Sequence, residues 1–417
     1  MNFAPLDLDT AGRILDFSGG DPELASLAEM QLEGAVSLHN IIADPDIGMG
    51  YLADEVGMGK TYVALGVVSL MRYFNPSLRV LFICPSANVQ DKWYDREYRS
   101  FVKQNVRVSH FRIRTPDGHP AVPRVSCANV RELILAATAG HYADFFVRMS
   151  AFSMGLSEEE SAWAARLEDL STILPAAQQK KLAESKRDVK ERYAAALNYA
   201  LPVFDLVVID EAHNFKHGFE SSDRNLVLSA ALGFRDTGTN QPRAKHALLL
   251  SATPYDRNLE ELRNQLRLVG KGSLLPDDID SEERDRAKFH ISTFMVRRLN
   301  ELTIGGRPYT RNMYRVEHRE GDKAEVRHTS DEQRLVTALV QKKVGEMLDR
   351  KDGGACFETG LLASFESYAE STRSPRVEFD GETLSRTPSD AEDKHVIGAI
   401  SDSYQCAGLG NTLPHPK

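Results

Sequence analysis

FDLVVIDEAHNFKH, Phe204–His217, joins an apolar run to two adjacent carboxylates and a histidine. The run is short, rich in Val and Ile, and apolar on both faces, which predicts a central strand of a parallel sheet covered by helices. A carboxylate pair at the end of a buried strand is costly unless a cation or another partner compensates it. This stretch therefore predicts an α/β fold with a polar site where one strand ends.

Four further apolar runs have the same character and alternate with helical stretches. The five runs are Met49–Ala53, Val80–Cys84, Phe145–Met149, Leu206–Ile209 and Ala247–Leu250. Such alternation of short strands with helices is typical of a parallel sheet that lies between two helical layers. We therefore predict a three-layer α/β lobe with a parallel central sheet.

Two parts of the chain depart from this alternation. Residues 156–200 place apolar side chains at three- and four-residue steps, which predicts an inserted helical hairpin with Pro175 at its turn. Beyond residue 320, the strongly helical segment 331–350 is followed by looser sequence. We predict that this C-terminal extension is mainly helical.

LADEVGMGKT, Leu52–Thr61, is close to the phosphate-binding pattern that opens with Gly and closes with Gly-Lys-Ser/Thr, but Asp54 stands in place of the opening glycine. The stretch follows a predicted strand and precedes an amphipathic helix. That order brings backbone N–H groups and a helix N-terminus to one point, which favours a bound polyphosphate. The alternative is a structural turn that ends in a solvated lysine.

If the loop binds a nucleotide, its residues have distinct tasks. The backbone at Gly57 and Gly59 would approach the phosphates, and Lys60 would reach the β and γ phosphates. Thr61 would give its hydroxyl to magnesium. ATP with Mg²⁺ is the cofactor that this pattern indicates.

The acid pair of the opening stretch complements such a loop. Asp210 fits the acid that holds magnesium, and Glu211 fits the group that orients or deprotonates the attacking water. His213 would lie near the γ phosphate as a coupling residue. The alternative is an acid pair that stabilises a helix N-terminus, an explanation weakened by the loop upstream.

The fifth apolar run ends in hydroxyl groups. In HALLLSATPYDRN, Ser251 and Thr253 follow the strand directly. Side chains at the carboxyl ends of parallel strands face the crevice where open α/β sheets bind ligands. The two hydroxyls could also cap the helix that follows, and both roles could hold together.

Composition sets further limits. The chain has 417 residues, enough for two or three domains, and its net charge of −9 argues against a protein that coats nucleic acid non-specifically. A local basic groove is still compatible with that charge. The N-terminus lacks a secretory signal, and no apolar stretch approaches the roughly 20 residues that cross a bilayer. We expect a cytoplasmic protein with no membrane contact.

Taken in order, these motifs resemble the superfamily-two helicases, specifically the Swi/Snf-like DNA translocase ATPases. The resemblance covers about Gln31 to Arg298 and includes the DEAH box and the coupling motif LLSATP. In this family an Asp-Glu pair commonly precedes Gly-x-Gly-Lys-Thr, as it does in LADEVGMGKT. The segment STFMVRRLNEL, 292–302, is similar to the Phe-x-x-Arg-Arg sequence that leads toward the second lobe of the family.

The resemblance implies roles for further residues. Gln31, in MQLEGA, would read the adenine base. Pro85, Ser86 and Trp93, in the segment after the second apolar run, would line a path for double-stranded DNA. Ser150, after the third run, would contact the DNA backbone. Ser251 and Thr253 would couple nucleotide to DNA.

It also implies an organisation. We expect 1–45 to be a helical segment with the adenine-reading motif, 46–270 a RecA-like ATP-binding lobe, 271–320 a linker, and 321–417 a helical bridging region that could bind protein partners. The second-lobe pattern Gln-x-x-Gly-Arg-x-x-Arg is missing from the sequence. The expected chain therefore carries the first RecA-like lobe only.

The implied activity is that of a DNA-dependent ATPase motor lobe. It would hydrolyse ATP to ADP and phosphate when a second RecA-like lobe, in cis or in trans, completes the site, and would be weak alone. One alternative is a non-hydrolysing module that binds nucleotide and a protein partner. Another is the motor part of a restriction or phage-defence complex.

Overall fold

The computed structural model describes residues 3–298, except 56, 108–109, 154–185, 220–221, 235–240 and 277–283, together with four short strands beyond them. The chain divides into two compact units, Met1–Arg315 and Val316–Lys417. In the second unit, the described residues form a hairpin in which β10 (Arg376–Phe379) pairs antiparallel with β11 (Glu382–Ser385).

The first unit is built on a seven-stranded sheet in the order β3-β4-β2-β5-β6-β1-β7. All of its strand pairs are parallel. The strands are β1 (Met49–Leu52), β2 (Val80–Cys84), β3 (Arg124–Cys127), β4 (Asp144–Arg148), β5 (Phe204–Ile209), β6 (Ala244–Leu250) and β7 (Met295–Val296). The predicted α/β class with a parallel central sheet is confirmed.

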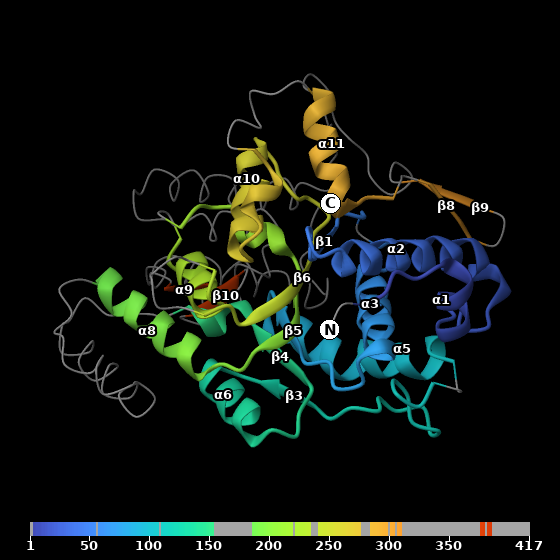
Figure 1. Cartoon of the computed structure of the whole chain (residues 1–417), viewed down its shortest axis with the longest axis horizontal. Helices are drawn as coiled ribbons and strands as arrows, with labels where there is room; N and C mark the ends of the chain where they lie inside the picture. The colour runs from blue at the N-terminus through green and yellow to red at the C-terminus, as the bar shows by residue number, and fades with distance from the viewer. Residues whose placement is uncertain are drawn as a thin grey trace, which may run out of the picture. The chain divides into compact units, whose positions relative to one another are not determined.

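Helices cover both faces of this sheet, as Figure 1 shows. One layer contains α1 (Leu8–Ile14), α2 (Ala25–Ala43), α3 (Lys60–Phe74) and α5 (Tyr98–Asn105). The other contains α6 (Val130–Ala139), α8 (Lys186–Ala200), α9 (Asp223–Ala231), α10 (Leu259–Leu268) and α11 (Arg284–Phe294). The three-layer arrangement is therefore the observed one.

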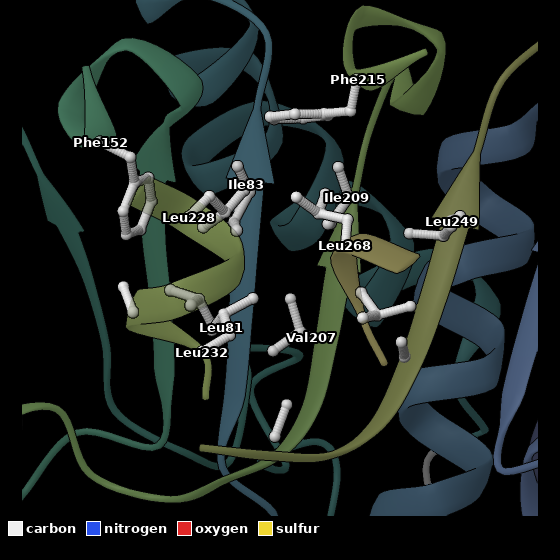
Figure 2. Packing of buried hydrophobic residues seen from close by; sticks show 14 of the residues in the cluster. Leu81, Ile83, Phe152, Val207, Ile209, Phe215, Leu228, Leu232, Leu249 and Leu268 are labelled. Carbon is white, nitrogen blue, oxygen red and sulfur yellow. The ribbon is translucent and has the colours of Figure 1, made fainter. Parts of the chain in front are cut away.

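Alternation along β2 shows why the strand is apolar on both faces. Leu81 and Ile83 point into the core beneath α9 and α10, where Figure 2 shows them beside Leu228 and Phe152. Phe82, between them, belongs to the opposite core and stacks on Phe146 with ring centroids 4.4 Å apart. A strand with period-two side chains needs apolar residues at every position when both faces are buried.

The five apolar runs of the sequence correspond to β1, β2, β4, β5 and β6. Two strands of the sheet have no counterpart among those runs. β3 is an edge strand whose first three residues are only half-buried, and β7 has two residues, so neither produces a continuous apolar signal. β7 pairs with β1, where Val296 O accepts a hydrogen bond of 2.8 Å from Ala53 N.

Two predicted elements fall largely outside the described residues. Of the helical hairpin expected over 156–200, the structure describes α8, and the part up to residue 185 lies outside. The helical region expected over 321–417 also lies outside, apart from β10 and β11. No helix among the described residues is both long and apolar enough to span a bilayer.

Candidate nucleotide-binding site

Three neighbouring strands bring the sequence motifs to one edge of the sheet. β1 and β5 both pair with β6, with Leu52 opposite Leu250 and Ile209 opposite Leu249. The loop after β1, the acid pair after β5 and Ser251 after β6 therefore leave the sheet side by side. This is the edge at which open parallel sheets bind ligands.

The loop after β1 turns sharply into α3. Gly57 and Gly59 have φ values of 88° and 76°, a left-handed conformation that glycine adopts without strain. A Cβ at Gly59 would lie 2.3 Å from Gln31 Nε2, so a side chain at this position would displace the Gln31 amide. No side chain caps α3 at Gly59, which leaves the amides of its first turn facing the loop.

Gln31 lies beside this turn, although it belongs to α2 and precedes Met58 by 27 residues. Its Nε2 donates a hydrogen bond of 3.2 Å to the carbonyl oxygen of Met58. The side chain is buried on α2, whose residues pack against α3. The structure thus places the glutamine against the backbone of the loop.

Lys60, the first residue of α3, points back into the loop. Its Nζ donates to the carbonyl oxygens of Asp54 at 3.0 Å and Glu55 at 3.2 Å. Burial lowers the pKa of Lys60, while the negative charges of Glu211 and Asp210 oppose that shift. The ammonium and the two carboxylates of the DEAH box therefore share one electrostatic environment. Thr61, the next residue, is partly buried in the first turn of α3.

Asp210 is the more buried acid of the pair. Burial, followed by repulsion from Glu211, raises the pKa of Asp210 to about 6. Trp93 Nε1 donates to Asp210 Oδ2 at 3.0 Å, and the Glu211 N–H donates to Asp210 Oδ1 at 3.0 Å. These donors fix the carboxyl group in one orientation.

Glu211 has an unusual backbone. Its φ of 50° and ψ of 51° are left-handed, and it is the one non-glycine with positive φ in the described part of the chain. Such a conformation is uncommon for a residue with a Cβ and gathers at functional sites. The hydrogen bond with His213 lowers the pKa of Glu211, and its carboxylate is therefore ionised at neutral pH.

His213 links the acid pair to the end of β6. Its Nδ1 lies 3.2 Å from Glu211 Oε2 and 2.9 Å from Ser251 Oγ. Ser251 Oγ in turn accepts a hydrogen bond of 3.1 Å from the Thr253 N–H. A continuous polar path therefore runs from Glu211 to Thr253.

The residues expected along the DNA path occupy different places. Ser86 and Ser150 are partly exposed and follow β2 and β4, which are neighbouring strands. Ser86 also accepts a hydrogen bond from Val89 N as the N-cap of α4 (Ala87–Asp91). Pro85 is buried. Trp93 is 2% exposed, and its indole faces Asp210 instead of the surface.

The structure reveals one pairing that the sequence patterns did not assign. Asp54, the residue in place of the opening glycine, is fully buried and forms an ion pair with Arg298, which follows β7. The only indication of this pairing in the sequence was the charge of Asp54, because a carboxylate that becomes buried requires a partner. The position of that partner, 244 residues away, had no such signal.

These groups suit magnesium-bound nucleotide. Mg²⁺ prefers oxygen ligands and binds through one or two carboxylates together with substrate phosphates. Asp210 offers a partly buried carboxylate with no Lys or Arg hydrogen-bonded to it among the described contacts, and Thr61 offers a hydroxyl in the first turn of α3. The described residues contain no cluster of three or more His, Cys, Asp or Glu side chains that could hold a metal ion without such phosphates.

The burial of Asp210 gives a test by pH. Its pKa of about 6 in the folded protein exceeds the ordinary 3.8, so between these values the folded state binds more protons than the unfolded state. Wild-type protein should therefore lose stability relative to Asp210→Asn as the pH rises. We expect the difference in unfolding free energy to grow by about 1.4 kcal/mol per pH unit and to level off above that pKa. Urea unfolding across this range measures it, and a flat difference would contradict the assigned burial.

Known proteins show partial similarity to this chain. A mouse (Mus musculus) protein, DNA excision repair protein ERCC-6-like, is 26% identical over 251 residues, which are 60% of this chain and 15% of the relative. The chain thus matches a small part of that protein's length.

Two solved structures also match. The Sulfolobus solfataricus SWI2/SNF2 ATPase core in complex with dsDNA has 16% identity and a TM-score of 0.39, with 96% of this chain and 67% of that chain covered. The Sulfolobus solfataricus SWI2/SNF2 ATPase core domain has 15% identity and a TM-score of 0.39, with 84% and 56% covered.

A family model, type III restriction enzyme, res subunit, matches residues 26–256. The match begins in α2 and ends after the Ser-Ala-Thr segment, so it contains the loop, the acid pair and the end of β6. Because it spans more than half of the 417 residues, the chain belongs to this family.

Proposed function

We propose that this chain is the ATP-binding motor lobe of a DNA-dependent ATPase, hydrolysing ATP to ADP and phosphate when a second lobe completes it. The observation that carries the proposal is that the neighbouring strands β1, β5 and β6 bring Lys60 and its loop to the same sheet edge as Asp210 and Glu211, whose charges act on the pKa of the lysine. A cation beside two acids at the N-terminus of an uncapped helix is an arrangement suited to a magnesium-bound polyphosphate.

Each residue at the sheet edge has a role in this proposal. The backbone of Gly57 and Gly59 lets the phosphates approach α3, and Lys60 neutralises their charge. Asp210 and Thr61 would hold Mg²⁺, and the bound ion would stabilise negative charge on the phosphates. Gln31 reads the adenine base from its place against the loop.

Glu211 and His213 perform the step that follows binding. Glu211, ionised and partly exposed, orients the attacking water and accepts its proton. His213 contacts both Glu211 and Ser251, and so it couples the state of the nucleotide site to the Ser-Ala-Thr segment.

DNA is the proposed partner of the adjoining edge. Ser86, Ser150 and Thr253 follow three strands whose carboxyl ends share this side of the sheet, and hydroxyls commonly contact phosphate oxygens of a duplex. Pro85 shapes the start of the segment that carries Ser86. We assign Trp93 to the orientation of Asp210 and not to DNA, because its indole is buried against that carboxylate.

A second lobe is the proposed missing component. Arginines contributed in cis or in trans are worth about 10³ to 10⁵ in rate in related phosphate-loop enzymes. Turnover by this chain alone should accordingly be weak. The region 321–417 is the proposed bridge to that lobe or to protein partners.

The proposed ATPase function is tested by measuring ATP turnover. The measurement is made with and without duplex DNA, and again with a second-lobe polypeptide added. We expect DNA to stimulate turnover and Lys60→Ala to reduce it to background. Lys245→Ala is the matched control, because Lys245 lies near the start of β6 and pairs with Asp205, away from the site. Nucleotide binding without turnover, even with the second lobe, would favour a non-hydrolysing interaction module instead.

The name of the matching family favours a particular setting, the motor part of a restriction or phage-defence complex. The chemistry of the lobe would be the same there. ATP-dependent cleavage of duplex DNA by the chain together with the proteins encoded beside it would support this setting. Turnover without cleavage in that mixture would support a translocase that acts in another process.

A further inference from the structure

Asp54 occupies the position where a phosphate loop ordinarily opens with glycine, and its carboxylate is fully buried. Arg298 contacts both oxygens of that carboxylate. Its backbone N–H donates to Oδ1 at 2.8 Å, its Nε donates to Oδ2 at 3.0 Å, and its Nη2 also contacts Oδ2. The ion pair is thus multiply hydrogen-bonded and largely shielded from water, the arrangement in which pairing is strongest.

The opposite side of the guanidinium is anchored on α2. Nη1 of Arg298 donates to the carbonyl oxygen of Met30, the neighbour of Gln31. A Cβ at Gly34 would lie 2.4 Å from Nη1, so this glycine provides the space that the guanidinium occupies. Arg298 therefore bridges α2 and the loop.

Asp54 also contacts the lysine of the loop through its backbone. Its carbonyl oxygen accepts the hydrogen bond from Lys60 Nζ, while its side chain is held by Arg298. The charge of Asp54 is close enough to act on the pKa of Lys60. An uncompensated carboxylate here would weaken the attraction between the loop and a polyphosphate, because like charges repel strongly where water is excluded.

We propose that Arg298 is a positioning residue that neutralises Asp54 and fixes it between α2 and the loop, so that the loop accepts a nucleoside triphosphate. This inference rests on the proposed nucleotide-binding function. It assigns a task to the second arginine of the Phe-x-x-Arg-Arg sequence, whose own chain position is far from the loop. It also explains how an acid is compatible with a phosphate site.

The number of phosphates on the ligand distinguishes this role from a general structural one. In Arg298→Gln the unpaired charge of Asp54 would act on ATP more than on ADP, and hardly on adenosine. We expect the Kd for ATP to rise about tenfold or more, and that for adenosine to change by less than about twofold. Fluorescence or calorimetric titration of the full chain with all three ligands, at low and high salt, measures the pattern.

Two more variants keep the test decisive if Arg298→Gln folds poorly. In Gly34→Ala, the new Cβ displaces the guanidinium, so ATP affinity should fall, while the improved helix propensity offsets part of the stability lost with the ion pair. In Asp54→Asn combined with Arg298→Gln, the pair becomes neutral, and ATP affinity should recover to within about threefold of wild type.

The matched control is Arg297→Gln, since Arg297 is the adjacent arginine and is exposed. It should leave the affinity for ATP unchanged. Equal losses for ATP and adenosine in Arg298→Gln, or an unchanged affinity for ATP, would overturn the inference while the proposed function stands. Failure of the wild-type chain to bind ATP would overturn both.

Discussion

Glu211→Gln is expected to lower DNA-stimulated ATP turnover by about 10²- to 10⁴-fold, the usual contribution of a general base. The amide keeps the size of the carboxylate but cannot accept a proton from water. The left-handed backbone of Glu211 and its contact with His213 hold the side chain at the edge beside Lys60 and Asp210. Steady-state turnover with saturating duplex DNA and a second-lobe polypeptide measures the loss.

The affinity of Glu211→Gln for ATP should stay within about threefold of wild type, because the proposed phosphate contacts come from Lys60 and the loop. Glu260→Gln is the control, since Glu260 lies on α10 and pairs with Arg263 and Arg267. A parallel fall in binding and turnover would show that Glu211 supports the shape of the site. Retention of full turnover would remove it from the reaction.

Arg72→Met is expected to destabilise the lobe by about 3–5 kcal/mol, the usual cost of breaking a buried ion pair by removal of one partner. Arg72 on α3 lies 2.5 Å from Asp144 at the start of β4, and both side chains are buried. Tyr98, on α5, donates to the same carboxylate and accepts from Arg72 Nη1 at 2.8 Å. Without Arg72, Asp144 would be a buried charge that retains one donor from this network.

Urea unfolding followed by circular dichroism measures this change. Arg72→Met combined with Asp144→Leu and Tyr98→Phe should recover most of the loss, because apolar replacement of a whole buried network is often neutral. Lys288→Met is the surface control, as the Lys288–Asp285 pair is exposed and should contribute less than about 1 kcal/mol. A loss for Arg72→Met as small as that of the control would contradict the buried network.

Local sequence was sufficient for most of the lobe. β5 and its acid pair lie within one continuous stretch, and so do β1, the loop and α3. Period-two burial and glycine conformation depend on near neighbours along the chain, and therefore leave a readable pattern. β7 could not be found in this way, since its two residues become a strand only by pairing with β1.

In the candidate site, too, some features could be predicted from local sequence and others depend on long-range contacts. The sequence alone showed four candidate residues that come shortly after apolar strands: Lys60, Asp210, Glu211 and Ser251. Because the strands are parallel, this order suffices to place the four residues at one edge of the sheet. Their detailed partners were not readable. The contact of His213 with Ser251 and the orientation of Asp210 by Trp93 depend on side-chain geometry across neighbouring elements.

By itself, then, the sequence determined the parallel α/β lobe and the order of its motifs, because hydrophobic period and loop chemistry are local. The tertiary structure alone decided that Trp93 faces Asp210 and that Arg298 pairs with Asp54. Both are contacts between residues more than 100 positions apart. Their energy comes from burial of charge and hydrogen-bonding groups in low dielectric, which exists only after the helices close over the sheet.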